Sequence, residues 1–238
     1  MIVQRRRGLL SLVALLAIFG MALHGPLLAA AQDDPASGDF NFKDLDGFQR
    51  GAGRTYMGDI SALFGSLDAL ATPGAEVATP DFSQLGLFLL GGFVAQFDSS
   101  DNASAGFDKL ADQITQGSQE DEDLTFTETQ VDNLGDKTKA FSGQYSEEGI
   151  DGTAMVIMTQ KGDFIYAAVA VSFGSDPTDA VTSFITDMTN NKPGEGDGTF
   201  KDDGTSTGGL WDVFPSSDAD YLKGLTPMSD EDLATADA

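Results

Sequence analysis

The run FIYAAVAVSF, residues 164–173, constrains the fold most, because it is apolar on both of its alternating faces. Successive side chains of a β-strand point to opposite sides of the sheet. A strand with two apolar faces is therefore expected inside a sheet that is covered on both sides. Lys161 and Gly162 come just before this run and predict a tight hairpin turn from a second apolar strand at 152–160, with the glycine at positive φ.

Other strands are expected at 87–97, 124–131 and 138–145, where apolar runs or alternating residues lie between turn-forming ones. Apolar residues at helical spacing predict three amphipathic helices. Asp59 can cap the first, Ser99 or Ser100 the second and Asp176 the third, with Pro177 at its first position; their ranges are 58–70, 99–114 and 175–188. The sequence thus predicts an α+β fold, a mainly antiparallel sheet covered by about three helices.

Two stretches echo one another, FVAQFDSSDNASAGFDKLADQ at 93–113 and VAVSFGSDPTDAVTSFITDM at 169–188. Each shows an apolar strand, a phenylalanine, a polar cap and a helix. One interpretation is a duplication, in which strand–helix halves at 45–118 and 123–191 share one sheet. The other is that any strand running into a capped helix looks like this. In either case Phe173 and Phe184 are expected to pack together, where the last strand meets its helix.

The first 31 residues have the pattern of an export signal: three arginines, an apolar run at 8–23, then small residues before Gln32. An uncleaved membrane anchor is the alternative. The chain has no cysteine, so a lipoprotein is excluded, and the predicted location is secreted or associated with the cell envelope. A polar linker at 32–44 leads to the globular domain at 45–191, and no stable membrane insertion is expected after signal cleavage.

The chain is strongly acidic, with 13 basic and 38 acidic side chains and a formal net charge of −25. Removal of the signal takes away three arginines and no acid, so the mature net charge is about −28. This charge argues against nucleic acid and anionic membrane surfaces as partners, because both need basic footprints. It favours solubility and, more weakly, divalent cations or basic partners.

Histidine and cysteine chemistry is closed to the mature protein, because His24 is the single histidine and lies in the signal. Ser-His-Asp and Cys-His catalysis are excluded, as are the usual zinc, copper, haem and iron–sulfur ligand sets. Carboxylate pairs, a Ser–Lys pair, and oxygen ligands for calcium or magnesium remain possible. None of these has a signature here, so no catalytic residue and no cofactor is predicted, and a metal site stays open.

An apolar island interrupts the tail at 192–238, which otherwise has the composition of a flexible acidic segment. The island spans 208–225, and its candidate docking residues are Leu210, Trp211, Val213 and Phe214. It can dock on its own domain or serve as a recognition segment for another protein. Docking on its own domain is favoured, with Trp211 mostly buried. Two nearby prolines favour an extended segment over a helix.

The stretch LGDKTKAFSGQY at 134–145, followed by the apolar hairpin at 152–171 and a helix, resembles a pattern in small exported bacterial proteins. It is similar to PsbP-like α/β/α sandwich lipoproteins and to extracellular sensor domains of bacterial receptor-like kinases, over about a third of the chain. The matching positions are turn residues: Gly135, Asp136, Lys161, Gly162 and Asp163. The resemblance implies a fold and an envelope location, and it implies no catalytic residue.

These observations favour a secreted or cell-surface, non-enzymatic binding or accessory module. Its partner would be an unknown protein or a small apolar ligand. A carboxylate-dependent polysaccharide hydrolase is an alternative, and it requires two buried carboxylates in a cleft. A structural or calcium-dependent envelope protein is a further alternative.

The mature protein is expected to begin at Gln32, because small residues occupy the positions that signal peptidase recognises. N-terminal sequencing of protein from the culture fluid checks this expectation. A protein that starts at Met1 and fractionates with membranes would contradict it.

Overall fold

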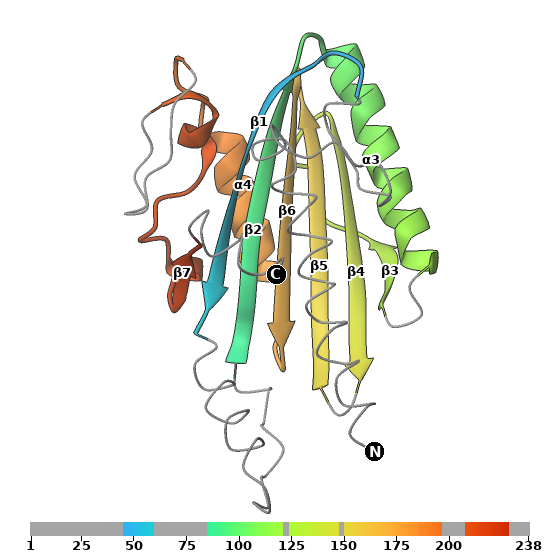
Figure 1. Cartoon of the computed structure of the whole chain (residues 1–238), viewed down its shortest axis with the longest axis vertical. Helices are drawn as coiled ribbons and strands as arrows, with labels where there is room; N and C mark the ends of the chain where they lie inside the picture. The colour runs from blue at the N-terminus through green and yellow to red at the C-terminus, as the bar shows by residue number, and fades with distance from the viewer. Residues whose placement is uncertain (1–44, 60–84, 121–123, 148–149, 197–207, 229–238) are drawn as a thin grey trace, which may run out of the picture.

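The computed structural model describes residues 45–59, 85–120, 124–147, 150–196 and 208–228 (Figure 1). They form a seven-stranded sheet in the order β3-β4-β5-β6-β2-β1-β7, antiparallel throughout. The strands are β1 (Phe48–Gly58), β2 (Gly86–Phe97), β3 (Leu124–Thr129), β4 (Lys137–Glu147), β5 (Ile150–Lys161), β6 (Phe164–Phe173) and β7 (Leu225–Pro227). Two α-helices, α3 (Ser100–Glu120) and α4 (Thr178–Asn190), accompany two short 3-10 helices, η3 (Gly209–Val213) and η4 (Asp220–Leu222).

The doubly apolar strand lies where its sequence predicted. β6 is the middle strand of the sheet, and every residue after Phe164 is buried. The hairpin from β5 turns at Gly162, whose φ of 62° is in the region that favours glycine. The prediction of an antiparallel sheet in an α+β fold is confirmed. The described residues hold two α-helices and not three, because residues 60–70 of the first predicted helix lie outside the described part.

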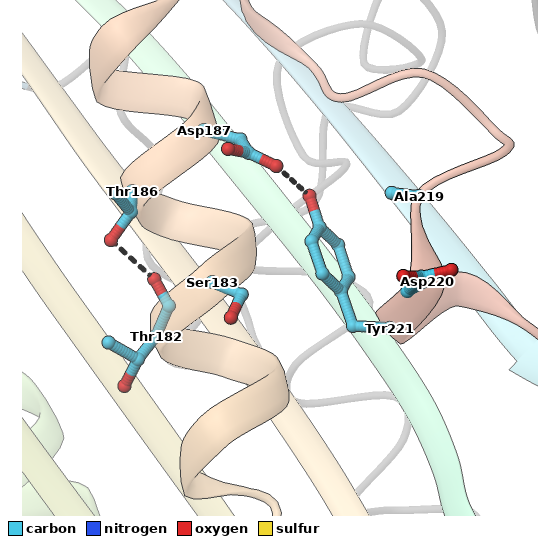
Figure 2. Close-up of a pocket in the computed structure, with 7 residues that line it drawn as sticks. All are labelled: Thr182, Ser183, Thr186, Asp187, Ala219, Asp220 and Tyr221. Carbon is cyan, nitrogen blue, oxygen red and sulfur yellow. Dashed lines mark hydrogen bonds between the residues drawn. The ribbon is translucent and has the colours of Figure 1, made fainter.

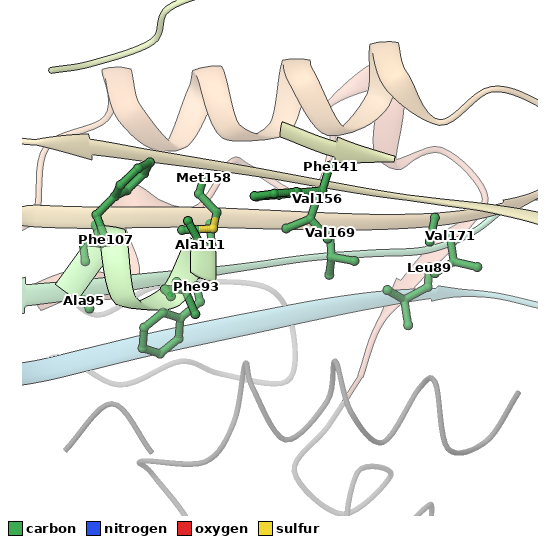
Figure 3. Packing of buried hydrophobic residues seen from close by; sticks show 14 of the residues in the cluster. Leu89, Phe93, Ala95, Phe107, Ala111, Phe141, Val156, Met158, Val169 and Val171 are labelled. Atoms are coloured by element: carbon green, nitrogen blue, oxygen red, sulfur yellow. The ribbon is translucent and has the colours of Figure 1, made fainter. Parts of the chain in front are cut away.

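Each face of the sheet has a helix packed on it. Apolar side chains of α3 pack on one face, against alternate residues of β2, β5 and β6 (Figure 3). The buried stripe of α4 packs on the opposite face and comprises Val181, Phe184, Ile185 and Met188. The two-sided burial that the β6 sequence demands therefore comes partly from helices on both sides.

Both helices begin at the polar residues that the sequence indicated. The Ser99 hydroxyl accepts a hydrogen bond from the Asn102 N–H at 3.3 Å, which caps α3. The Asp176 carboxylate accepts one from the Thr178 N–H at 2.9 Å. The Thr178 hydroxyl donates to the same carboxylate oxygen, and this bond, together with the one from the N–H, favours the charged carboxylate and lowers the pKa of Asp176. The helix starts at Thr178 with Pro177 as its N-cap residue, so the expectation that Pro177 occupies the first helical position is wrong by one residue.

The expected contact between Phe173 and Phe184 is wrong. Phe173 lies on the α3 side of the sheet and packs edge-on against Phe88, with ring centroids 5.5 Å apart. Phe184 lies on the α4 side, where it packs edge-on against Tyr56 at 5.9 Å. The reason is that successive side chains of a strand point to opposite faces of the sheet. Tyr166, Ala168 and Ala170 of β6 face α4, so Phe173, an odd number of residues away from them, points to the other face.

Gly92 lets α4 lie close to the sheet. A Cβ at this position would stand 2.4 Å from the Phe184 ring and 2.7 Å from the Met188 sulfur. Any larger residue would therefore push the helix away from β2. The close approach explains why Phe184 is completely buried although it comes from a helix on the outside of the sheet.

Turn residues of the hairpin pattern form hydrogen bonds that connect the turn before β4, the turn between β5 and β6, and the C-terminal end of α4. The Asp136 carboxylate accepts a hydrogen bond from the Gly162 N–H at 2.8 Å, and the Asp136 N–H donates to the Gln160 carbonyl at 2.7 Å. Lys161 Nζ donates to the Thr189 carbonyl at 2.9 Å. Because α4 has no basic residue in its last turn, Lys161 supplies the positive charge that favours a helix C-terminus.

The two sequence halves share one sheet through the antiparallel pair of β2 and β6. The units β1-β2-α3 and β5-β6-α4 nevertheless have opposite hands. Three features are reversed between the two units. The strands β2 and β6 run in opposite directions, their hairpin partners β1 and β5 lie on opposite sides of this pair, and the helices α3 and α4 pack on opposite faces of the sheet. No rotation superposes hairpin–helix units related in this way, and a duplication of the strand–helix halves alone stays a prediction.

Replacement of Phe184 by alanine should lower the free energy of unfolding by about 3–5 kcal/mol, because it empties a fully buried aromatic site. Urea unfolding of the mature protein measures this loss. The neighbouring exposed position provides the control, since Ser183→Ala should change stability by less than about 0.5 kcal/mol. Equal effects of the two substitutions would mean that α4 is not part of the core.

Candidate functional site

An open groove of about 510 Å³ lies along the outer side of α4, where the C-terminal residues pack beside the helix (Figure 2). We call residues 208–228 the C-terminal strap. The wall from α4 consists of hydroxyl and carboxylate side chains, and the strap contributes a small residue, a carboxylate and a phenol. The lining residues are Thr182, Ser183, Thr186, Asp187, Ala219, Asp220 and Tyr221.

The strap packs on the α4 side of the sheet and extends the sheet by one strand. Leu210, Val213 and Phe214 are buried in the core cluster beneath α4, and Leu222 joins them. At its far end β7 pairs with residues 56–58 of β1. The strap therefore covers apolar surface that α4 alone does not reach.

Polar contacts fix the strap at its start and its middle. The Gly194 N–H donates to the Gly209 carbonyl at 2.8 Å, and Asn191 Nδ2 donates to the Val213 carbonyl at 3.1 Å. After the end of α4, the Gly196 carbonyl accepts a hydrogen bond from Nη1 of Arg50 in β1 at 2.7 Å. These bonds join the end of α4 and the sheet to the segment that leads into the groove.

The four candidate docking residues do not lie in the groove. Leu210, Val213 and Phe214 are buried against this chain's own core, whereas Trp211 is half-buried, with its ring centroid 5.9 Å from that of Phe214. Trp211 packs against the same core cluster with only a minority of its surface exposed, in agreement with the expectation that it is mostly buried. Residues 209–213 form a 3-10 turn where an extended segment was expected, and the extended backbone begins at Phe214, before Pro215. A role of these residues in partner binding stays a prediction.

Asp187 and Tyr221 join the two walls of the groove. The Tyr221 hydroxyl donates a short hydrogen bond to Asp187 Oδ2 (Figure 2). Burial and the bond to this carboxylate both raise the pKa of Tyr221, because each disfavours the phenolate. The Tyr221 ring packs edge-on against Phe184, with centroids 6.2 Å apart. The Tyr221 phenol thus lies between the Asp187 carboxylate and the Phe184 ring.

Beneath Phe184 lies a second phenol, that of Tyr56. Burial raises the pKa of Tyr56 to about 12, although the Arg54 guanidinium carbon lies 4.5 Å from the ring centroid and favours the phenolate. The Tyr56 hydroxyl is buried and has no hydrogen-bond partner among the described residues. Tyr56, Phe184 and Tyr221 thus form a row of aromatic rings from the sheet to the groove.

The remaining lining groups differ in how available they are. The Thr186 hydroxyl donates to the Thr182 carbonyl at 2.7 Å, a bond internal to the helix. Asp220 forms an exposed ion pair with Lys223 at 2.7 Å. Ser183 is exposed. The charged side chains that line the groove are both acidic, and its surface is of mixed polar and apolar character. Whether it binds a protein or a small apolar ligand stays a prediction.

Two alternative functions depend on particular acidic sites. Among the described residues whose burial is known, no aspartate or glutamate is buried, whereas a carboxylate hydrolase requires two in a cleft. Within the same ranges no group of three or more acidic, histidine or cysteine side chains could hold a metal ion. The described helices include none that is long and apolar enough to cross a membrane.

The sequence predicts the two elements that form the groove, but it does not predict that they lie side by side. The polar face of α4 and the apolar residues of the strap were both predicted, as separate features. Asp187 and Tyr221 are 34 positions apart, and nothing local in either segment indicates their contact. The one available signal was the acidic Asp187 near the end of a helix, where a negative charge opposes the helix dipole.

The buried Tyr56 phenol should make the protein lose stability in alkali. Its pKa is about 12 in the folded protein against an ordinary value of 10.0, so the stabilisation is complete below about pH 10 and is lost as the pH rises through about 12. At about 1.4 kcal/mol per unit, the loss from this residue is about 2–3 kcal/mol. Urea unfolding at about pH 8 and about pH 12 should show a smaller loss for Tyr56→Phe than for the unchanged protein. Equal losses would contradict the assignment.

No family model matches the chain, and no curated protein sequence matches it. Among solved structures, the chain is similar to the extracellular domain of PknH from Mycobacterium tuberculosis, with a TM-score of 0.32 and 12% sequence identity. The match covers 63% of this chain and 92% of that one. PknH is a receptor-like kinase, as in one of the two groups that the hairpin pattern resembles. A similarity of this size carries no argument about function, and the PsbP-like resemblance stays a prediction.

Proposed function

We propose that the chain is an exported, non-enzymatic binding module of the cell surface. Its partner would bind in the groove between α4 and the C-terminal strap. The observation that carries this proposal is the construction of the groove. Two segments distant in the sequence meet there, and the Tyr221 hydroxyl links them through Asp187.

The shape and lining of the groove favour a protein partner over a small apolar molecule. Apolar ligands bind in enclosed cavities lined mainly by apolar side chains. Here Ser183 and Asp220 are exposed at the walls, and most lining side chains are polar. An open polar groove suits side chains that project from the surface of another protein.

Export and the missing side-chain chemistries support the same proposal. The signal pattern at 1–31 would direct the chain out of the cytoplasm, and the mature protein left after its removal would have no histidine or cysteine. The nucleophile–base pairs that use those residues are thus excluded. The hydrogen bond between Asp187 and Tyr221 links the two walls of the groove and supports its use as a recognition surface.

Site-specific photo-crosslinking in intact producing cells tests the proposal. A photoreactive amino acid at Ser183, in the groove, should form an adduct with a particular surface protein. The same amino acid at Asp112, exposed on α3 at the opposite face of the sheet, serves as the matched control. Identical adducts from both positions, or none from Ser183, would contradict a binding role for the groove.

A further inference from the structure

We infer that the groove receives a lysine or arginine side chain of the partner protein, with its positive charge at Asp187. This inference rests on the proposed function and names the chemistry of the partner. The charged residues that line the groove are two carboxylates, Asp187 and Asp220, and no lining residue is basic. Charge complementarity therefore selects a cationic group.

Asp187 is the better placed of the two carboxylates. Asp220 already pairs with Lys223, in an exposed contact of small energetic value. The Tyr221 hydroxyl bonds to one oxygen of Asp187, Oδ2, and orients the carboxylate group. A carboxylate has acceptor capacity for several donors, so an incoming ammonium or guanidinium group can bind beside the phenol.

The position of Asp187 in α4 also favours an incoming cation. The residue lies in the last turn of the helix, where the dipole favours positive charge, and α4 itself has no basic residue there. Lys161 partly fills this need by donating to the Thr189 carbonyl. A partner's basic side chain at Asp187 would offset the repulsion between the carboxylate and the helix C-terminus.

The aromatic rings favour an organic cation over a metal ion. Tyr221 lines the groove and is backed by Phe184, and aromatic faces attract ammonium and guanidinium groups. A metal ion would need several oxygen ligands, and no group of three acidic side chains among the described residues could hold one. The net charge of about −28 would steer a basic partner toward the protein and increase its association rate.

The test uses acetyl-tetralysine-amide as the probe and the mature protein, at about 0.15 M salt, where the Debye length is about 8 Å. Amide NMR shifts should be confined to residues 182–187 and 219–221, which carry the groove. Asp187→Asn should weaken binding about tenfold, because it removes the paired charge. The matched control Asp112→Asn removes an equal charge on the α3 side and should change binding less than about twofold.

Tyr221→Phe tests how much the orientation of Asp187 contributes, apart from its charge. This substitution keeps the Asp187 carboxylate and removes only the Tyr221 hydroxyl that donates to it. It should weaken tetralysine binding by less than Asp187→Asn does, and unchanged amide spectra away from the groove would show that each variant is folded. Equal weakening by the Asp187 and Asp112 substitutions would overturn the inference, since attraction would then be general. Binding of acetyl-tetraserine-amide or maltotetraose as tight as that of tetralysine would overturn it too. A crosslink from Ser183 together with either result would leave the proposed function standing.

Discussion

The structure depends on a sheet that is apolar on both faces. β6 is buried along nearly its whole length, and β2 and β5 on either side of it are mostly buried as well. Such a sheet is stable only if each face is covered, because each exposed large apolar side chain forfeits about 1.5–3 kcal/mol. The helices α3 and α4 cover parts of opposite faces. The C-terminal strap continues the cover on the α4 side, toward the sheet edge at β1.

The C-terminal strap also covers the edge of the sheet at β1. Ala52 to Tyr56 of β1 are all buried, although β1 would be an outer strand without the strap. The strap pairs with β1 through β7 and then through the Met228 N–H, which donates to the Thr55 carbonyl at 2.9 Å. Covering an edge in this way prevents strand pairing with other molecules. The groove is a by-product of the same packing, since its second wall is the strap.

How far the sequence predicts the fold is seen best in β6, β1 and α4. The two-sided apolar pattern of β6 and the caps at Ser99 and Asp176 are local signals, and each marked its element correctly. β1 was missed because FQRGAGRTYMG contains glycines and arginines in place of an apolar alternation, and its buried residues pack against distant parts of the chain, such as Phe184 of α4 on Tyr56. The mistaken contact between Phe173 and Phe184 came from proximity in sequence, which ignores the face to which a strand residue points. Likewise the groove depends on a contact between α4 and the strap that no short window of sequence contains.

The central claim is that the C-terminal strap is part of the folded core. Its most direct test compares the free energy of unfolding in urea of two truncated mature proteins, one ending at Thr207 and one at Met228. The protein ending at Thr207 lacks the buried Leu210, Val213, Phe214 and Leu222. It should be less stable by at least about 4 kcal/mol or fail to fold, because these side chains together contribute more than that. The protein ending at Met228 keeps the whole strap and should retain the free energy of unfolding of the untruncated mature protein. Equal stability of the two proteins, within about 0.5 kcal/mol, would contradict the account.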